Sequence, residues 1–563
     1  MFTASLSRYE AYVLDTLKKI ENEKIVERLY QKDFTVWSEK PEEISNRLGW
    51  LESPANSMKL IDEINEFVED VKKCGFKKAL LLGMGGSSLA PEVFSLTFGV
   101  KEGFLSLGVL DSTDPDAVLN HAEKYPPEET LYIVSTKSGG TVETFSFMKF
   151  FYNLSVDRLG AEKAGYQFIA ITDPGSGLES KAKELRFRKI FLNDPNIGGR
   201  YSVLSLFGMV PAALLGINIK TLLNRASEAS VNCRTEKITL LADNEGFSLG
   251  AIIGTLASGG KDKLTFFISP EVESFGAWIE QLVAESSGKN GKGILPVVDE
   301  QIDEPGNYTS DRAFVVIELK ENRVFIKETQ KLKEAGFPVI EIVLDDLYDL
   351  GREFFNWEIA TAVACWQLGV QPFDQPNVES AKVQARKVVK SYQEEGRLPQ
   401  LDVALLEDEI KTFSSLKCNS IKDYLNSFLC KSVPGKSYIS VHAYVKPEGN
   451  TGILLKEFQE KLRKRFKTPV TIGYGPRFLH STGQLHKGDS GNGLFIQILS
   501  ATVSDVPIPD EAGELKSSMT FGVLRNAQAM GDRQALIDND REVISFEFLC
   551  ETHTGLKKLI DSF

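Results

Sequence analysis

Short apolar runs alternate with amphipathic stretches through much of this chain. A first series of strand-like runs comprises KALLLGMG (78–85), FLSLGVLD (104–111), LYIVSTKS (131–138), YQFIAITD (166–173) and RKIFLND (188–194). Helical patterns such as SGLESKAKEL separate these runs. Strands that alternate with helices predict a parallel sheet covered by helices on both faces. We expect this unit at residues 56–220, after an N-terminal helical segment at residues 1–55.

The same pattern recurs after a long apolar helix expected near residues 201–215. Its strand-like runs are DKLTFFISP (262–270), RAFVVIEL (312–319) and PVIEIVLD (338–345). A second α/β unit is therefore expected at residues 221–395. A mostly polar stretch around 390–405, which contains Gly-Arg-Leu-Pro, predicts a boundary.

The remaining residues, 396–563, show a different order of elements. Strand-like KSYISVHAYV is followed by helical LLKEFQEKLRKRF, strand-like VTIGYG and LFIQILSA, helical MTFGVLRNAQAMGDRQALI and strand-like VISFEFL. This β-α-β-β-α-β order predicts an antiparallel α+β module of the split βαβ kind. The fold class is thus α/β, with two doubly wound parallel-sheet domains and a C-terminal α+β module.

Composition narrows the class of protein. The chain has 563 residues, 42% of them hydrophobic and 25% charged, as expected for a globular protein of about three domains. A net charge of −13 argues against nucleic acid and anionic membranes as main partners. No apolar run has the length of a membrane span or signal sequence. The six cysteines lack CxxC or metal-like spacing, which predicts free thiols in the cytoplasm and no metal site.

The segment STKSGGTVET (135–144) lies between a predicted strand and a predicted helix. Thr141 is a candidate N-cap, and the free N–H groups and positive end of the following helix favour an anion. The hydroxyls of Thr136, Ser138 and Thr141 can donate to phosphate oxygens. The alternative is a glycine-containing turn with an ordinary cap, and this segment alone does not decide between the two.

A second loop in the same predicted sheet favours the phosphate interpretation. GMGGSSLAP (83–91) is again rich in glycine and hydroxyl groups and again joins a strand to a helix. It lacks the GK[ST] ending of a nucleotide P-loop, and its glycines do not have the GxGxxG spacing. Two such loops without a nucleotide fingerprint predict the phosphate of a small molecule.

Four further residues are candidates for chemistry. Arg200 follows a double glycine, where a guanidinium can bind an anion or a developing enolate. Gln281 and Glu285 share one helical face, and Glu285 is close to a Ser-Ser-Gly break, where a carboxylate can become a general base. His480 lies in the polar, glycine-containing segment FLHSTGQLHKG, and histidine is the usual proton shuttle near neutral pH. Each of them, taken alone, is more often a surface or structural residue.

Together these motifs resemble the phosphoglucose isomerase family over most of residues 56–395 and, more weakly, around His480. GMGGSSLAP resembles the family's GIGGSxLGP loop, and TKSGGTVET resembles its phosphate loop. Four further segments are similar to family motifs: IGGRYS, QLVAESSGK, PFDQPNVESAK and FLHSTGQ. The resemblance implies two sugar-isomerase (SIS-type) domains that interconvert glucose 6-phosphate and fructose 6-phosphate.

The resemblance also implies a role for each matched residue. Glu285 would move a proton between C2 and C1, Arg200 would stabilise the cis-enediolate, and Gln281 would orient sugar hydroxyls. His480, helped by Lys382 and oriented by Glu143, would open the sugar ring. The substrate phosphate would be held by Ser87, Thr136, Ser138 and Thr141, with backbone near Gly86 and Lys137. Such a reaction needs neither a metal nor a redox cofactor.

Three departures from the family pattern stand out. His480 follows the PFDQ segment instead of preceding it, an order similar to the isomerase half of fused transaldolase–phosphoglucose isomerases, although no transaldolase barrel is predicted. Ser287 replaces the usual asparagine of ESNGK, and Gly140 replaces a threonine of the phosphate loop. In the family a neighbouring subunit supplies the histidine, which implies a homodimer. Whether His480 acts in cis is left open by the sequence.

Other functions remain open at this stage. The substrate is expected to be a hexose 6-phosphate, but another phosphosugar such as mannose 6-phosphate is an alternative. A non-catalytic phosphosugar-binding protein is a second alternative, against which the joint presence of Glu285, Arg200, Lys382 and His480 argues. A Rossmann dehydrogenase is disfavoured because the spaced glycines and the following acidic residue are missing.

Overall fold

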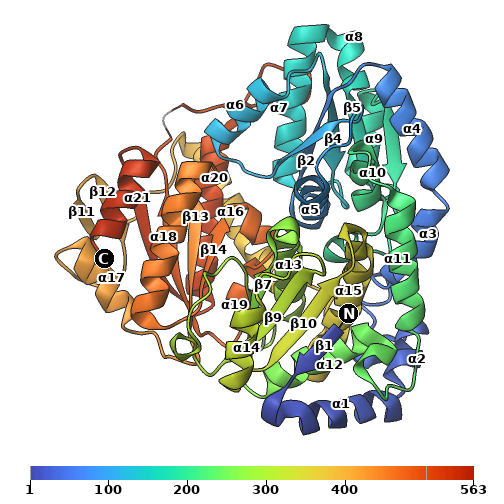
Figure 1. Cartoon of the computed structure of the whole chain (residues 1–563). Coiled ribbons are helices and arrows are strands. Elements are labelled where there is room, and N and C mark those ends of the chain that lie inside the picture. The colour runs from blue at the N-terminus through green and yellow to red at the C-terminus, as the bar shows by residue number, and fades with distance from the viewer. Residues whose placement is uncertain (1, 503) are drawn as a thin grey trace.

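Three β-sheets of five or six strands, besides one two-stranded sheet, organise the protein in the computed structural model, which describes residues 2–502 and 504–563. In Figure 1 the first sheet lies at the upper right, the second below it, and the third, in orange and red, at the left. Helices pack around all three sheets (Figure 1). Within the described residues, none of the helices combines the length and the apolar character needed to cross a bilayer.

The first sheet confirms the parallel α/β unit predicted from the alternating pattern. Its strand order is β3-β2-β4-β5-β6, with every pair parallel. The strands are β2 (Lys78–Gly83), β3 (Ser106–Leu110), β4 (Thr130–Ser135), β5 (Phe168–Thr172) and β6 (Lys189–Leu192). Leu81 packs in the core that includes α4 (Ile61–Lys73), whereas Leu80 and Leu82 pack with Phe147 of α7 (Val142–Leu159). Both faces are therefore covered, which explains the continuous apolar runs.

The second sheet is parallel apart from one strand. Its order is β1-β10-β9-β7-β8, formed by β1 (Phe2–Ser5), β7 (Lys263–Ile268), β8 (Leu295–Val297), β9 (Arg312–Leu319) and β10 (Val339–Leu344). β1 pairs antiparallel with β10. The N-terminal helical segment expected at residues 1–55 therefore also contains a strand, which was not predicted because four residues are too few to give a periodic signal. The long helix expected near 201–215 is α10 (Leu206–Leu214), which begins later than predicted.

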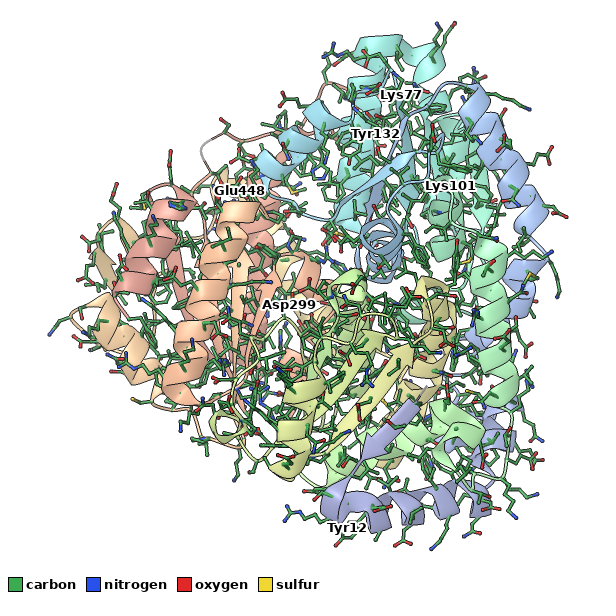
Figure 2. All side chains as sticks on the ribbon, viewed as in Figure 1. Tyr12, Lys77, Lys101, Tyr132, Asp299 and Glu448 are labelled. Carbon is green, nitrogen blue, oxygen red and sulfur yellow. The ribbon has the colours of Figure 1, made fainter. Side chains whose placement is uncertain are left out.

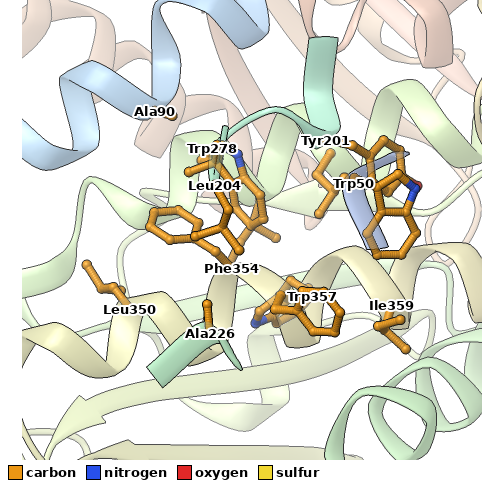
Figure 3. Close-up of a cluster of buried hydrophobic side chains, with 14 of the residues drawn as sticks. Trp50, Ala90, Tyr201, Leu204, Ala226, Trp278, Leu350, Phe354, Trp357 and Ile359 are labelled. Carbon is orange, nitrogen blue, oxygen red and sulfur yellow. The ribbon is translucent and has the colours of Figure 1, made fainter. Parts of the chain in front are cut away.

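A cluster of buried aromatic side chains lies between the first two sheets (Figure 3). The ring centroids of Trp278 and Phe354 lie 4.8 Å apart, and those of Trp50 and Tyr201 lie 5.1 Å apart. Trp278 belongs to α13 (Phe275–Ser287), and Tyr201 ends the short helix η6 (Gly199–Tyr201). The cluster thus fixes the two elements that carry Glu285 and Arg200.

The third sheet corrects the topology predicted for the C-terminal module. Its order is β11-β12-β18-β15-β13-β14, and the four strands β14 (Val470–Tyr474), β13 (Tyr438–Tyr444), β15 (Gly493–Leu499) and β18 (Glu542–Phe548) are mutually parallel. The predicted antiparallel split βαβ arrangement is therefore wrong, although each of its six elements is present. A further short helix, α19 (Gly483–Gly488), lies between β14 and β15 and was read as loop. An antiparallel hairpin, β11 (Leu405–Glu407) and β12 (Ile410–Phe413), completes the sheet against β18.

The C-terminal module contacts both other units, and side chains fill the space between them (Figure 2). Its helix α20 (Phe521–Asp538) crosses α16 (Pro376–Glu395) closely, since a Cβ on Gly531 would lie 2.6 Å from the backbone nitrogen of Ala385. Arg525 of α20 donates from Nη1 to Oδ2 of Asp114 at 2.6 Å. The predicted domain boundary near residue 395 stays a prediction, because α16 packs on the module that follows it.

Candidate active site

The two glycine- and hydroxyl-rich loops lie next to each other at the carboxyl ends of neighbouring strands. β2 leads into η4 (Gly85–Ser87), and β4 leads through residues 136–141 into α7. The hydroxyl of Ser135 donates to the backbone oxygen of Ser87 at 3.2 Å and so joins the loops. This edge of an open parallel sheet is where ligands commonly bind.

Arg200 and Glu285 form a buried ion pair beside these loops. Nη1 of Arg200 lies 3.1 Å from Oε1 of Glu285, and the two side chains are 4% and 8% exposed. Glu285 stands near the end of α13, and Arg200 in η6. The structure therefore brings together two residues that the sequence placed far apart.

The Arg200 guanidinium also donates to four further groups, one of which is Oε1 of Gln375, 3.4 Å from Nη1. Nε donates to the hydroxyl of Ser286 at 2.8 Å, and Nη2 donates to the backbone oxygens of Asp374 at 3.0 Å and Pro372 at 2.5 Å. Lys289 in turn donates to Oδ1 of Asp374 at 2.6 Å. Burial, followed by the charge of Arg200, lowers the pKa of Lys289 to about 8. The PFDQP segment thus serves to fix the arginine.

Gln281 connects the ion pair to the C-terminal module. Its Nε2 donates to Oε2 of Glu285 at 3.2 Å and to the backbone oxygen of His480 at 2.7 Å. Its Oε1 is buried and has no hydrogen-bond partner among the described residues. A buried acceptor of this kind is available to a ligand hydroxyl.

Two glycines permit the close approach of the loops. Gly85 has a φ of +56°, and a Cβ there would lie 2.8 Å from the backbone oxygen of His480. A Cβ on Gly86 would lie 2.0 Å from the backbone oxygen of Gly199, the residue before Arg200. The glycines of GMGGSS are therefore required by contacts with η6 and with the C-terminal module.

His480 reaches this site from the same chain. Its Nε2 lies 2.9 Å from Oε1 of Glu143, in the first turn of α7. Burial raises the pKa of Glu143, but the charge and hydrogen bond of His480 outweigh burial, and the net pKa lies below its ordinary value. The same oxygen accepts a hydrogen bond from Nε2 of Gln528 at 2.6 Å.

A second ion-pair cluster lies on the other side of His480. Arg477, in the same short helix η11 (Arg477–His480), pairs with Glu92 and lies 3.1 Å from Oδ2 of Asp111. Burial raises the pKa of Asp111 to about 6, against the lowering effect of Arg477. This cluster holds η11 against the first sheet.

The expected phosphate-binding residues differ in their contacts and in their exposure to solvent. Thr136 and Thr141 face each other, with 3.1 Å between their hydroxyl oxygens. Thr141 is the N-cap residue of α7, as predicted, but its side chain does not cap the helix. Ser87 is nearly buried and Ser138 is exposed. Lys137 pairs with Asp173 and donates to the backbone oxygen of Pro195, so its charge is already partnered.

Three other sequence-derived candidates do not line the site in the expected way. Lys382 is 42% exposed, and its nearest carboxylate is that of Glu379, at 4.0 Å. Ser287 is fully buried and donates to the backbone oxygen of Val283 at 2.7 Å, so it supports α13. Gly140 is exposed and has room for a side chain, since a Cβ would lie 3.7 Å from its nearest neighbour, the hydroxyl oxygen of Ser138.

Sequence reasoning missed Gln528, Ser286 and the Arg477 cluster. A signal for Gln528 was present, because Arg525, Gln528 and Asp532 recur at helical spacing on one face of a mostly apolar helix. Each makes a buried polar contact: Arg525 with Asp114, Gln528 with Glu143 and Asp532 with Lys487.

Comparisons with known proteins point to one family. The family model "Phosphoglucose isomerase" matches residues 52–299. The glucose-6-phosphate isomerase of Campylobacter jejuni is 26% identical over 389 residues, which cover 62% of this chain and 93% of that protein. The glucose-6-phosphate isomerase of Mycoplasmopsis pulmonis is 28% identical over 391 residues, 61% of this chain and 90% of that protein.

Solved structures share the fold. A glucose-6-phosphate isomerase from Chlamydia trachomatis superposes with a TM-score of 0.58 at 16% identity, covering 70% of this chain and 89% of that one. A hypothetical protein from Thermus thermophilus also gives a TM-score of 0.58, at 23% identity, covering 69% of this chain and 99% of that one. The matched family range includes Arg200 and Glu285 and ends before His480.

Proposed function

We propose that this chain, which is related to the phosphoglucose isomerase family over residues 52–299, is an aldose–ketose isomerase that interconverts glucose 6-phosphate and fructose 6-phosphate. The observation that carries the proposal is the buried pair of Glu285 and Arg200, 3.1 Å apart, beside two phosphate-type loops. A protein that only binds phosphosugars would not need a carboxylate and a guanidinium in contact at this position.

Glu285 is the base in this proposal. Going from the ketose to the aldose, its carboxylate removes a proton from C1, the C–H electrons form the C1–C2 double bond, and the electrons of the C2=O bond move onto O2 to give a cis-enediolate. The proton is then returned to C2 while O1 loses its proton to form the C1=O group and O2 gains one, so that one hydroxyl proton passes from O1 to O2. Arg200 lies next to Glu285 and donates to the oxygen on which negative charge develops. The free Oε1 of Gln281 accepts a hydrogen bond from a sugar hydroxyl and so orients the reacting carbons.

His480 opens the sugar ring. Its Nε2 faces the carboxylate of Glu143, which leaves Nδ1 for proton exchange with the ring oxygen and the anomeric hydroxyl. Within the described residues Lys382 is paired at 4.0 Å with Glu379, and its charge lowers the pKa of Glu143 without a hydrogen bond. The role implied for it in ring opening is therefore not part of the proposal.

The phosphate is held at the opposite end of the substrate. Thr136 and Thr141 present paired hydroxyls at the start of α7, and the backbone of η4 lies alongside. This contact supplies binding energy at a distance from the reacting carbons. Ser87 and Ser138 complete the hydroxyl set, whereas Lys137 contributes through its backbone, because its side chain is paired with Asp173.

One chain contains every group that the proposal uses. His480 contacts Glu143 and Gln281 of its own chain, so we propose that it acts in cis and that a homodimer is not needed to complete the site. The cysteines in the described residues are unpaired, which is in keeping with our expectation of a cytoplasmic enzyme of sugar-phosphate metabolism.

The test is turnover of fructose 6-phosphate by purified protein, with glucose 6-phosphate followed by coupled NADP reduction. We expect turnover, and a loss of at least about a thousandfold in kcat/KM for Arg200→Ala. Mannose 6-phosphate is assayed in parallel by its conversion to fructose 6-phosphate. Faster turnover of mannose 6-phosphate would reassign the substrate, whereas binding without turnover of either sugar would overturn the enzymatic proposal.

A further inference from the structure

We infer that Gln528 of the C-terminal module is a positioning residue, which holds Glu143 so that this carboxylate fixes the orientation and tautomer of His480. The inference rests on the proposed function for the role of His480 in ring opening. The dependence of the His480 tautomer on Gln528 is argued from hydrogen bonds alone and does not require the proposed function. Gln528 lies outside the residues that match the family model.

A chain of three hydrogen bonds, two buried and the last partly buried, carries the inference. The hydroxyl of Thr113 donates to Oε1 of Gln528 at 2.8 Å, and Nε2 of Gln528 donates to Oε1 of Glu143 at 2.6 Å. That same carboxylate oxygen lies 2.9 Å from Nε2 of His480. Thr113 is fully buried, and Glu143 and Gln528 are 4% and 5% exposed.

The partners determine which way each group points. The ionised carboxylate of Glu143 can only accept, so the amide NH₂ of Gln528 is turned towards it, and the amide oxygen accepts from the Thr113 hydroxyl, which can donate or accept. The amide of Gln528 is neutral, so it donates a hydrogen bond to the ionised carboxylate of Glu143 but does not exchange a proton with it. Oε1 of Glu143 accepts the Nε2–H of His480, so that in the neutral form of the imidazole Nδ1 is the nitrogen without the proton.

Gln528 is itself held rigidly on α20. Three residues before it, Arg525 donates to Asp114 at 2.6 Å and to the hydroxyl of Ser500 at 2.9 Å. Four residues after it, Asp532 accepts from Lys487 at 2.6 Å, with both side chains buried. Buried ion pairs thus fix α20 on both sides of Gln528. The hydrogen bond from Gln528 in turn holds Glu143 in place against the C-terminal module.

The other charged groups around His480 do not replace Gln528. Asp111, at the carboxyl end of β3, and Arg477, in the turn that carries His480, form an ion pair with each other. Lys382 of α16 acts on Glu143 only from a distance. Among the described residues, the side chains that donate hydrogen bonds to the Glu143 carboxylate are those of His480 and Gln528.

The experiment compares Gln528→Leu with the full-length parent by NMR of protein labelled with ¹⁵N in the imidazole rings. The chain has five histidines, and His480→Asn identifies the His480 signal. In the parent we expect the neutral Nε2–H tautomer. In Gln528→Leu we expect a mixture of both tautomers, together with about a tenfold lower kcat and little change in KM.

Three controls make the result specific. Gln534→Leu changes an exposed glutamine of the same helix, which contacts Asp538, and should leave the spectrum and activity unchanged. Thr113→Val should shift the tautomers less than Gln528→Leu, and the double variant should be no worse than Gln528→Leu alone. The signals of buried His442 and His486, which lie outside the chain of hydrogen bonds, report whether the variants fold.

The outcomes separate the two proposals. An unchanged Nε2–H tautomer in folded Gln528→Leu overturns the inference, whether or not the parent is an isomerase. A mixed tautomer in Gln528→Leu supports it. If the parent does not turn over hexose phosphates while the tautomer depends on Gln528, the proposed function fails and the positioning role stands.

Discussion

Replacing Gly86 by alanine tests whether the contact between η4 and η6 sets the geometry of the active site. The added Cβ would lie 2.0 Å from the backbone oxygen of Gly199 and 3.0 Å from the backbone nitrogen of Arg200. Real Cβ atoms practically never approach a neighbour closer than 3.0 Å, so the two loops must separate by 1.0 Å, the difference between 3.0 and 2.0.

The size of the effect follows from what this displacement moves. Arg200 follows Gly199 directly, and its Nη1 lies 3.1 Å from Oε1 of Glu285. A displacement of this size therefore breaks the contact between the two side chains. A misplacement of about 1 Å can lower kcat/KM by about a hundredfold, or about 2.7 kcal/mol in transition-state stabilisation. The overpacking costs about 1–3 kcal/mol of stability, which leaves a domain of ordinary stability folded.

The assay is kcat/KM for fructose 6-phosphate, together with thermal unfolding of the same samples. Gly199→Ala is the matched control, because a Cβ there meets nothing within 4 Å. We expect this control to stay within about twofold of the parent. Parental kcat/KM in Gly86→Ala, with an unchanged Tm, would refute the argument that this contact positions Arg200.

Three further predictions address binding, stability and assembly. Gly140→Thr should lower KM for hexose 6-phosphates by about two- to tenfold at similar kcat, because the loop has room for a side chain whose hydroxyl can donate to the phosphate. An unchanged or higher KM in steady-state kinetics would contradict this. Burial, followed by the charge of Glu245, raises the pKa of Glu353 to about 8 from 4.5, so the folded state keeps a proton that the unfolded state loses and stability falls as pH rises between these values. Glu353→Gln should therefore be more stable than the parent at pH 8, by up to about 5 kcal/mol, and this gain should shrink towards pH 5. Denaturant titrations measure it, and an equal gain at both pH values would show that the pKa of Glu353 is not raised in the folded state. Specific activity should stay constant when the protein is diluted from micromolar to nanomolar concentration, and a loss that follows dissociation measured by mass photometry would show that a partner subunit is needed.

Most strands of the first two sheets could be predicted because their signals are local, whereas the short strands β1 and β8 were not predicted. KALLL and LYIV are apolar throughout since both faces of the sheet are covered, and the glycine- and hydroxyl-rich loops follow them directly. The pairing of Arg200 with Glu285 could be inferred from the family motifs, although residues far apart in the chain create it.

What escaped prediction depends on tertiary contacts. The direction of β15 and β18 is not encoded in their own apolar residues, and α19, which carries the chain between β14 and β15, is too short for a clear helical period. The motif assigned Lys382 a role in ring opening, but the course of α16 leaves its side chain 42% exposed. Gln528 matters through Glu143, 385 residues away in sequence.

The most direct test of the central claim is the isomerisation of fructose 6-phosphate in D₂O by the parent and by Glu285→Gln, with deuterium at C2 of glucose 6-phosphate measured by NMR. Proton transfer through Glu285 predicts solvent deuterium at C2 with the parent and a loss of both turnover and exchange of several orders of magnitude with Glu285→Gln. Because Glu285 can return to C2 the proton that it took from C1, the deuterium at C2 is expected at less than full occupancy, and undiminished turnover or exchange in Glu285→Gln would contradict the assignment of Glu285 as the base.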